Sequence, residues 1–318
     1  MFDYEFQQTA KTLDLKRLLK PLLAAEQAMA RLDERMRALP FCDGVIERLI
    51  YREACAVSLL EGHLVPVEDL VEFEAGCLQK ISYPELSACH GTYVNLRDVW
   101  RAAPEALLSS SSPGEHRDRP RIPEEERNAL LCDLSWGETE RLSAWQNVRH
   151  ETASWPALLA AAFVWDAWQL LHPEQHGRWK SYLLASLMIK ARKAFGQGLL
   201  PLAWGAMHAD TRWDKRFPLN LRVEGFLEAV KASCERTQQE IIRLTHADAL
   251  MAREIEGKGK ASKLPQLKGL FLGRPLVSAR MIQRTLKVSP EGASYLLKQL
   301  GPGPREVTGQ RSYRVWGI

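Results

Sequence analysis

The sequence predicts a mainly α-helical protein, in which a large helical part is followed by a C-terminal winged helix-turn-helix. Three observations support this fold class. Apolar residues recur at three- and four-residue spacings through most of residues 12–255, which is the period of amphipathic helices. Residues 263–318 show the order of three short helices and a β-hairpin. Positive charge is concentrated over the same C-terminal stretch.

The composition is that of an ordinary globular protein. The chain has 318 residues, 46% hydrophobic and 26% charged, enough for two domains with their own cores. No secretory signal pattern is present, and the longest apolar stretch, 155–171, is interrupted by Asp166 and too short to span a bilayer. Six cysteines show neither CxxC spacing nor a Cys/His cluster. We expect a cytoplasmic protein with reduced thiols, no metal site, no cofactor and no membrane contact.

The charge distribution separates the C-terminal end from the rest of the chain. Residues 253–318 contain 13 Lys and Arg against 4 Asp and Glu, a net charge of +9, whereas residues 1–252 carry a net −5. Uncompensated cations gather where a protein meets a polyanion, so this asymmetry favours a nucleic-acid partner for the C-terminal segment. A solvated basic tail is the alternative.

The N-terminal segment, residues 1–108, is predicted to contain four helices. The first covers 12–38, with Pro21 as a candidate kink, and its apolar stripe comprises Leu15, Leu18, Leu22, Ala25, Met29, Leu32 and Met36. The next three are expected at Val45–Leu60, from Val67 onward and at Leu86–Ala103. Residues 109–128 then form a linker or exposed loop, because 109–126 (SSSSPGEHRDRPRIPEEE) combine serines, prolines and dense charge.

The helical core, residues 129–256, is predicted to hold helices at 130–145, 155–171 and 180–195, an irregular stretch at 196–218 and a long helix at 221–255. The long helix has a coiled-coil-like apolar stripe. Its members are Phe226, Val230, Cys234, Thr237, Ile241, Leu244, Ala247 and Met251. The stripe suits either packing on the same chain, which we favour, or a homodimer formed through this helix.

The C-terminal module, residues 263–318, contains two capped helices. A short helix at Lys263–Leu272 is followed by Ser278 as the N-cap of Ala279–Leu286, and Ser289 caps a third helix with Pro290 at its first position. The inner face of this third helix comprises Ala293, Leu296, Leu297 and Leu300. Residues 305–316 alternate around Thr308-Gly309 as a hairpin, which would form the wing.

A winged helix places its third helix in the major groove of double-stranded DNA and its wing on the backbone. The cations predicted to hold phosphates are Arg280, Arg284, Lys287, Arg311 and Arg314. The residues predicted to approach base edges are Ser294, Tyr295, Lys298 and Gln299. Winged helices also serve as protein-interaction modules, which remains the alternative.

Residues 52–70, REACAVSLLEGHLVPVEDL, resemble the N-terminal segment of Fic proteins, a family that transfers AMP or related groups to hydroxyl side chains. In that family the segment carries an autoinhibitory Ser/Thr-x-x-x-Glu-Gly motif. Glu61 and Gly62 match it, but Ser58 lies three residues before the glutamate and Val57 occupies the fourth place back. The order of long helix, basic linker and winged helix is also similar to many bacterial Fic proteins.

The Fic catalytic motif is degenerate here. Its pattern, His-x-Phe-x-Asp/Glu-Gly-Asn-Gly-Arg-x-x-Arg, supplies a histidine general base and a glycine-rich phosphate cradle. Residues 172–178, HPEQHGR, match at the first histidine and at Gly177-Arg178. Glu174 and His176 replace the phenylalanine and the acid, and the Asn-Gly pair and second arginine are missing. The resemblance implies only weak catalytic candidates, namely His172, His176, Arg178 and Glu61.

The whole chain also resembles an uncharacterised bacterial family that joins a helical domain of unknown function to a helix-turn-helix domain. The shared segments are RLDER (31–35), LEGHLVPVEDL (60–70), SKLPQL (262–267), RPLVSA (274–279), REVTG (305–309) and RVWGI (314–318). This resemblance supplies an architecture and no activity.

Three functions follow from these patterns. The first is a DNA-binding transcriptional regulator, not an enzyme, whose Fic-like helical domain senses a ligand or supports assembly. The second is a nucleotidyl transferase in which His172 or His176 acts as a base and a nucleotide binds the helical domain. The third is an antitoxin-like or scaffold protein that binds a protein partner. Without catalysis, the two histidines would be surface loop residues and Glu61 a carboxylate before the Gly62 helix cap.

Overall fold

The computed structural model describes residues 10–76, 83–110, 137–174, 177–211, 213–258, 262–307 and 314–318. The chain divides into two compact units, and each combines segments that are far apart in the sequence. The first unit consists of Met1–Glu34 and Asn95–Cys234, and the second of Arg35–Val94 and Glu235–Ile318. The mainly α fold class is confirmed, since strands occur only in one small sheet of the described residues.

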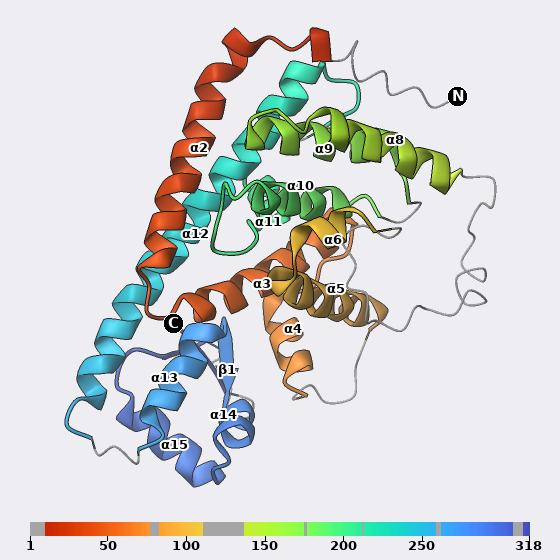
Figure 1. Cartoon of the computed structure of the whole chain (residues 1–318). Helices are drawn as coiled ribbons and strands as arrows, with labels where there is room; N and C mark the ends of the chain where they lie inside the picture. The colour runs from red at the N-terminus through yellow and green to blue at the C-terminus, as the bar shows by residue number, and fades with distance from the viewer. Residues whose placement is uncertain are drawn as a thin grey trace. The chain divides into compact units, whose positions relative to one another are not determined.

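The first unit is entirely helical over its described residues. Its centre is α9, an almost wholly buried apolar helix that packs against α8 and α10. Trp145 and Trp168 meet edge to face across this core, with ring centroids 5.1 Å apart. The helices that contribute to the unit are α2 (Leu15–Arg37), α5 (Pro84–Arg101), α6 (Pro104–Leu108), α8 (Glu138–Glu151), α9 (Ala157–Leu171), α10 (Lys180–Ala191), α11 (Leu202–Ala206) and α12 (Leu219–Ile255) (Figure 1).

A buried ion pair explains the single charge within the apolar run of α9. Asp166 is fully buried, and both of its carboxylate oxygens accept hydrogen bonds from Arg222 of α12, at 2.8 and 2.9 Å. The indole of Trp213 donates a third bond to the same carboxylate at 2.8 Å. A carboxylate so paired is tolerated in a core where an isolated charge would be expelled.

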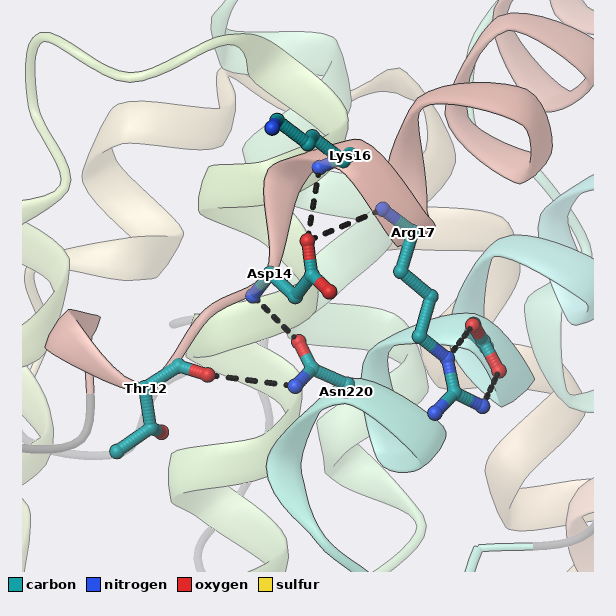
Figure 2. Close-up of polar contacts among 6 residues, drawn as sticks. Thr12, Asp14, Lys16, Arg17 and Asn220 are labelled. Carbon is teal, nitrogen blue, oxygen red and sulfur yellow. Dashed lines mark hydrogen bonds and ion pairs between the residues drawn. The ribbon is translucent and has the colours of Figure 1, made fainter.

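Helix α2 starts beside the start of α12, and polar contacts fix the two ends together (Figure 2). Asp14 caps α2 by accepting from the backbone N–H groups of Lys16 and Arg17, at 3.0 and 3.2 Å. Its own backbone N–H donates to Asn220 at 2.8 Å, and the Arg17 guanidinium pairs with the Glu224 carboxylate. The N-terminal turn of α2 is therefore well anchored.

The structure corrects one end of the apolar stripe predicted for α2. Leu18, Ala25, Met29, Leu32 and Met36 are buried as predicted. Leu15, however, is 59% exposed. Leu15 lies in the first turn of α2, about 60° around the helix from Leu18 and so at the edge of the buried stripe.

The stripe predicted on the long helix is buried along its whole length. All eight residues from Phe226 to Met251 are at most 6% exposed, so the stripe packs within the same chain and is not available for a homodimer. Of the two alternatives that the sequence allowed, intramolecular packing is the one observed.

The second unit contains the C-terminal module, which consists of α13, α14, α15 and a small three-stranded sheet. Its three antiparallel strands lie in the order β1-β3-β2, with Leu276 opposite Gly317 and Arg305 opposite the same residue on the other side. Strand β1 was not predicted. The elements are α3 (Cys42–Leu60), α4 (Val67–Glu74), α13 (Leu264–Gly273), α14 (Ala279–Leu286), α15 (Pro290–Gln299), β1 (Leu276–Ser278), β2 (Arg305–Glu306) and β3 (Val315–Gly317), with parts of α2, α5 and α12.

Several predicted boundaries differ from the structure. The helix expected up to Ala103 ends at Arg101, because Pro104 opens the separate helix α6. The helix expected at 180–195 ends at Ala191, before the positive φ of Lys193, and the stretch 196–218 contains the short helix α11. Most of the predicted linker 109–128 and the first part of the helix expected at 130–145 lie outside the described residues.

No helix within the described ranges combines the length and the apolarity that a membrane span requires.

Candidate DNA-binding surface

The C-terminal module has the element order of a winged helix: α13, β1, α14 and α15 (Figure 1) are followed by the paired strands β2 and β3. Both predicted serine caps are present. Ser278 accepts from the backbone N–H of Met281 at 3.2 Å, and Ser289 accepts from Gly292 at 3.1 Å with Pro290 at the first helical position. Helix α14 ends at Lys287, whose φ of 51° turns the chain toward α15.

Helix α15 presents one polar face to solvent. Its inner residues Ala293, Leu296 and Leu300 are buried. Ser294 and Lys298 are exposed on the outer face, and Tyr295 is 61% exposed, which is unusual for a large aromatic side chain. Gln299, also predicted to approach base edges, is half-buried, and its backbone carbonyl accepts a hydrogen bond from Lys258. The outer face is therefore narrower than the one predicted.

A groove of about 660 Å³ lies between α15 and the wing. Polar side chains from both elements line it: Ser294 and Lys298 from α15, and Glu306 and Arg314 from the wing. Arg314 and Glu306 approach to 3.7 Å, so the wing cation has a carboxylate beside it. The apolar part of the lining includes Ala279, Leu297, Pro304 and Trp316. Glu306 and Trp316 were not predicted as site residues, and they lie opposite each other in the antiparallel register of β2 and β3.

At least five of the cations at the C-terminal end serve internal contacts in the described structure. Lys258 and Lys263 donate to the last carbonyls of α15 and α14, where unpaired acceptors and the helix dipole favour a cation. Lys268 pairs with Asp248 at 2.8 Å. The other two are Arg274 and Arg284, which bind the end of α4. The net charge of +9 therefore overstates the charge available to a ligand.

Arg284, predicted to hold a phosphate, is engaged at the C-terminal end of α4. Its Nη1 donates to the carbonyl oxygens of Ala75 at 2.9 Å and Gly76 at 2.7 Å. The physical reason is that the last carbonyls of a helix have no partner within the helix. Sequence periodicity could not reveal this contact, because the two partners are about 208 residues apart.

A buried arginine, Arg48, joins α13 to α3 and α12. Arg48 of α3 is fully buried and donates to the carbonyl oxygens of Phe271 at 2.7 Å and Leu272 at 2.8 Å. Its third contact is the carboxylate of Glu240 on α12, at 2.9 Å. Burial lowers the pKa of Arg48 to about 10, and the guanidinium stays charged at neutral pH. Close backbone packing accompanies the bonds, since a Cβ on Gly44 would lie 3.2 Å from the Leu272 carbonyl.

A second network holds the start of β1. Arg274 donates to Glu74 of α4 at 2.7 Å and to the Tyr51 hydroxyl of α3 at 2.9 Å. Tyr51 in turn stacks on Tyr93 with ring centroids 4.5 Å apart. Arg48, Arg274 and Arg284 together fasten the winged helix to α3 and α4. The module is thus packed on α3 and α4 within the second unit.

The remaining predicted phosphate contacts are exposed or lie outside the described residues. Arg280, Lys287 and Arg314 are exposed. Arg311 and the Thr308-Gly309 turn lie outside the described residues. The structure brings Lys298 and Arg314 to one groove, whereas Arg284 faces α4.

The Fic-motif candidates lie in two different units. In the first, His172 ends α9 with a φ of 46°, and its pKa is lowered by burial and by Arg178, Arg141 and Lys215. The Arg178 guanidinium lies over the ring of Trp213, 5.8 Å from the centroid. In the second, Glu61 is exposed at the C-cap of α3, before Gly62 with a φ of 92°.

Two further observations bear on catalysis. The Glu174 carboxylate pairs with Lys180 of α10 at 2.6 Å, and the Gly177 carbonyl oxygen accepts from the indole of Trp168 on α9 at 2.7 Å, so both residues are bound to the flanking helices. His176 lies outside the described residues. Within the described residues, no group of three His, Cys, Asp or Glu side chains is arranged to hold a metal ion.

Comparison with known proteins agrees with this architecture. Residues 264–318 match a family described as "HTH DNA binding domain", and residues 130–256 match one described as "Protein of unknown function (DUF1612)". The chain is also 27% identical, over an alignment of 369 positions including gaps, to "Uncharacterized protein y4cF" of Sinorhizobium fredii (strain NBRC 101917 / NGR234). That alignment covers 95% of this chain and 97% of the relative. The protein therefore carries a DUF1612 domain followed by a C-terminal helix-turn-helix DNA-binding domain.

Proposed function

We propose that this protein is a sequence-specific, double-stranded-DNA-binding transcriptional regulator and not an enzyme. The observation that carries the proposal is the exposed polar face of α15 beside the wing groove, in a module that matches a DNA-binding family. The helical domain would adjust this activity by sensing a ligand or by supporting assembly.

The DNA contacts divide into two classes. Helix α15 has 10 residues, about 15 Å of helix, and this suits the major groove. Ser294, Tyr295 and Lys298 would contact base edges, where hydroxyl, aromatic and ammonium groups can read hydrogen-bond patterns or a thymine methyl. Arg280, Lys287 and Arg314 would hold phosphates and set the register of the helix in the groove.

The contacts that attach the winged helix to α3 and α4 support a regulatory role. Three arginines, Arg48, Arg274 and Arg284, bind the winged helix to α3 and α4. Any rearrangement of those two helices would therefore also move the exposed face of α15. Suppose that the second unit has two arrangements that differ in DNA affinity. A ligand that binds one of them more tightly than the other would then change the affinity for DNA, as a regulator requires.

The proposal is tested by titrating the purified full chain with random duplexes and with the region upstream of its own gene, across a salt series. We expect tighter binding to one fragment and an affinity that falls as salt rises. Equal affinity for every fragment would leave a non-specific DNA binder, and no binding even at low salt would favour a protein-interaction module.

A Fic-type transferase is the second candidate. The lowered pKa of His172 supports it, because a neutral imidazole at neutral pH can accept a proton from a hydroxyl group. The missing motif residues count against a phosphate cradle. Binding of ATP, GTP or UTP to the full chain, lost in Arg178→Gln, would favour the transferase. Flat titrations with all three nucleotides would exclude it.

An antitoxin-like or scaffold protein is the third candidate. Leu60 and Leu64, at 44% and 76% exposed, lie at the turn between α3 and α4 and would suit an apolar protein partner. A partner that co-purifies with the wild type and is lost in Leu64→Glu would support this function.

A further inference from the structure

A row of three exposed leucines runs along α2. Leu15, Leu19 and Leu23 are 59%, 56% and 46% exposed, and their four-residue spacing places them on one face of the helix. Single exposed leucines are ordinary on protein surfaces, but three on adjacent turns form a continuous apolar strip.

The row is displayed on a firmly held helix. The Asp14 cap, its bond to Asn220 and the pair between Arg17 and Glu224 fix the first turns of α2 (Figure 2). The adjacent face of the same segment is buried through Leu18 and Ala25. The three leucines are therefore exposed on a helix whose position is fixed by its buried face and its polar contacts.

We propose that this leucine row is a homodimer surface, on which α2 of a second copy lies antiparallel. The apolar stripe of α12 is buried and leaves no comparable surface there. Among the charges flanking the row, Lys16 and Glu26 distinguish the two directions, whereas Lys20 would lie near Lys20 of the second copy in either one. A parallel pairing would set Lys16 against Lys16 of the second copy. An antiparallel pairing brings Lys16, beside Leu15, within reach of Glu26 of the second copy, one turn beyond Leu23.

The size of the surface sets the strength of the dimer. One row of three leucines per copy is small compared with the roughly 1,200–2,000 Å² buried in stable complexes. The dimer is therefore expected to be weak and reversible. Such a weak dimer still suits a DNA-binding protein, because two linked modules on two half-sites gain affinity through effective concentration.

The test is sedimentation equilibrium of the full chain without DNA, so its outcome does not depend on the proposed DNA binding. The wild type is expected to show a monomer–dimer equilibrium. Leu19→Glu is expected to raise the dissociation constant at least about tenfold, since it buries a charge in the interface. Ile242→Glu is the matched control, because Ile242 on α12 is 55% exposed and lies outside the row, and it should leave the constant unchanged.

A charge exchange tests the antiparallel direction. Lys16→Glu and Glu26→Lys should each weaken the dimer by roughly threefold to tenfold, because two symmetry-related contacts become repulsive. The double variant should return to within about twofold of the wild type. Lys16→Glu is a mild change for folding, since an acidic residue is favoured in the first turn of a helix. Arg236→Glu, exposed on α12, controls for net charge.

Three results would overturn the proposal: a wild type that is monomeric at every concentration, a Leu19→Glu variant that dimerises like the wild type, or a double charge variant weaker than both single variants. The first two exclude the leucine row as an interface, and the third excludes the antiparallel arrangement. Circular dichroism spectra matching the wild type would show that each variant is folded.

Discussion

The guanidinium Nη1 of Arg284 lies 2.7 Å from the carbonyl oxygen of Gly76, and this bond fastens the second helix of the winged module to the end of α4. Gly76 has a φ of 64°, in the left-handed region that most residues other than glycine avoid. A Cβ at this position would lie 2.9 Å from the same Nη1. A side chain at position 76 would therefore disturb both the backbone conformation of this residue and its contact with Arg284.

Gly76→Ala should destabilise the protein more than Gly62→Ala does. Both glycines have positive φ, so each substitution should cost about 1–2 kcal/mol of backbone strain. At Gly62 nothing lies within 4 Å of the added Cβ, whereas at Gly76 the methyl displaces Arg284 and costs on the order of 1 kcal/mol more. Urea denaturation of the two variants measures the difference. Equal losses would show that the Arg284 contact contributes nothing.

Arg48→Met should lower the free energy of unfolding by about 3 kcal/mol, because it leaves two buried carbonyls and Glu240 without their donor. Arg243→Met is the matched control. Arg243 also pairs with Glu240 but is 49% exposed, so its loss should cost less than about 1 kcal/mol. Chemical denaturation monitored by tryptophan fluorescence checks both values. A loss no greater for Arg48→Met than for its control would contradict the buried network.

Ser289→Ala and Ser294→Ala should separate stability from recognition. Removing the Ser289 cap should cost about 1 kcal/mol, since the N–H of Gly292 loses its acceptor. Ser294 lies on the exposed face and should change stability little while altering sequence preference. Thermal denaturation and competition among duplexes give the two readouts. The assignment of faces on α15 would be wrong if the two variants exchanged these effects.

The imidazole of His172 should titrate below the ordinary value of 6.5, since burial and then Arg178, Arg141 and Lys215 disfavour its charged form. The unfolded chain then binds a proton more readily. The contribution of this group to stability is therefore complete above about pH 6.5 and is lost as the pH falls through the folded pKa. NMR titration of the ring protons tests this. Arg178→Gln should raise the pKa, and an unchanged value would remove that cation as a cause.

The sequence predicted the local features of the C-terminal module well. Ser278 and Ser289 cap their helices because a serine hydroxyl satisfies N–H groups only two or three residues away. The exposure of Ser294, Tyr295 and Lys298 followed from helical periodicity in the same way. The apolar stripe of α12 was also visible in the spacing, and the structure decided what it packs against.

Contacts between distant segments were not accessible from the sequence. Arg48, Arg274 and Arg284 are ordinary basic residues in a single sequence, and only the fold brings them to helix ends and to Glu74. Strand β1 is three residues long and gains its pairing from β3, about 40 residues later, so it carries little local signal. Leu15 was assigned to the core because its spacing fits, although it lies at the edge of the buried stripe and is exposed.

The most direct test of the DNA-binding face is a salt-series titration of wild type, Lys298→Gln and Lys268→Gln on the duplex that binds best. Both variants lose one charge from the same module, but Lys298 lies on the outer face of α15 and Lys268 pairs with Asp248. We predict that Lys298→Gln weakens binding about tenfold or more, a loss of roughly 1–3 kcal/mol, while Lys268→Gln binds like the wild type. Equal binding by both variants, or a larger loss for Lys268→Gln, would contradict the assigned face.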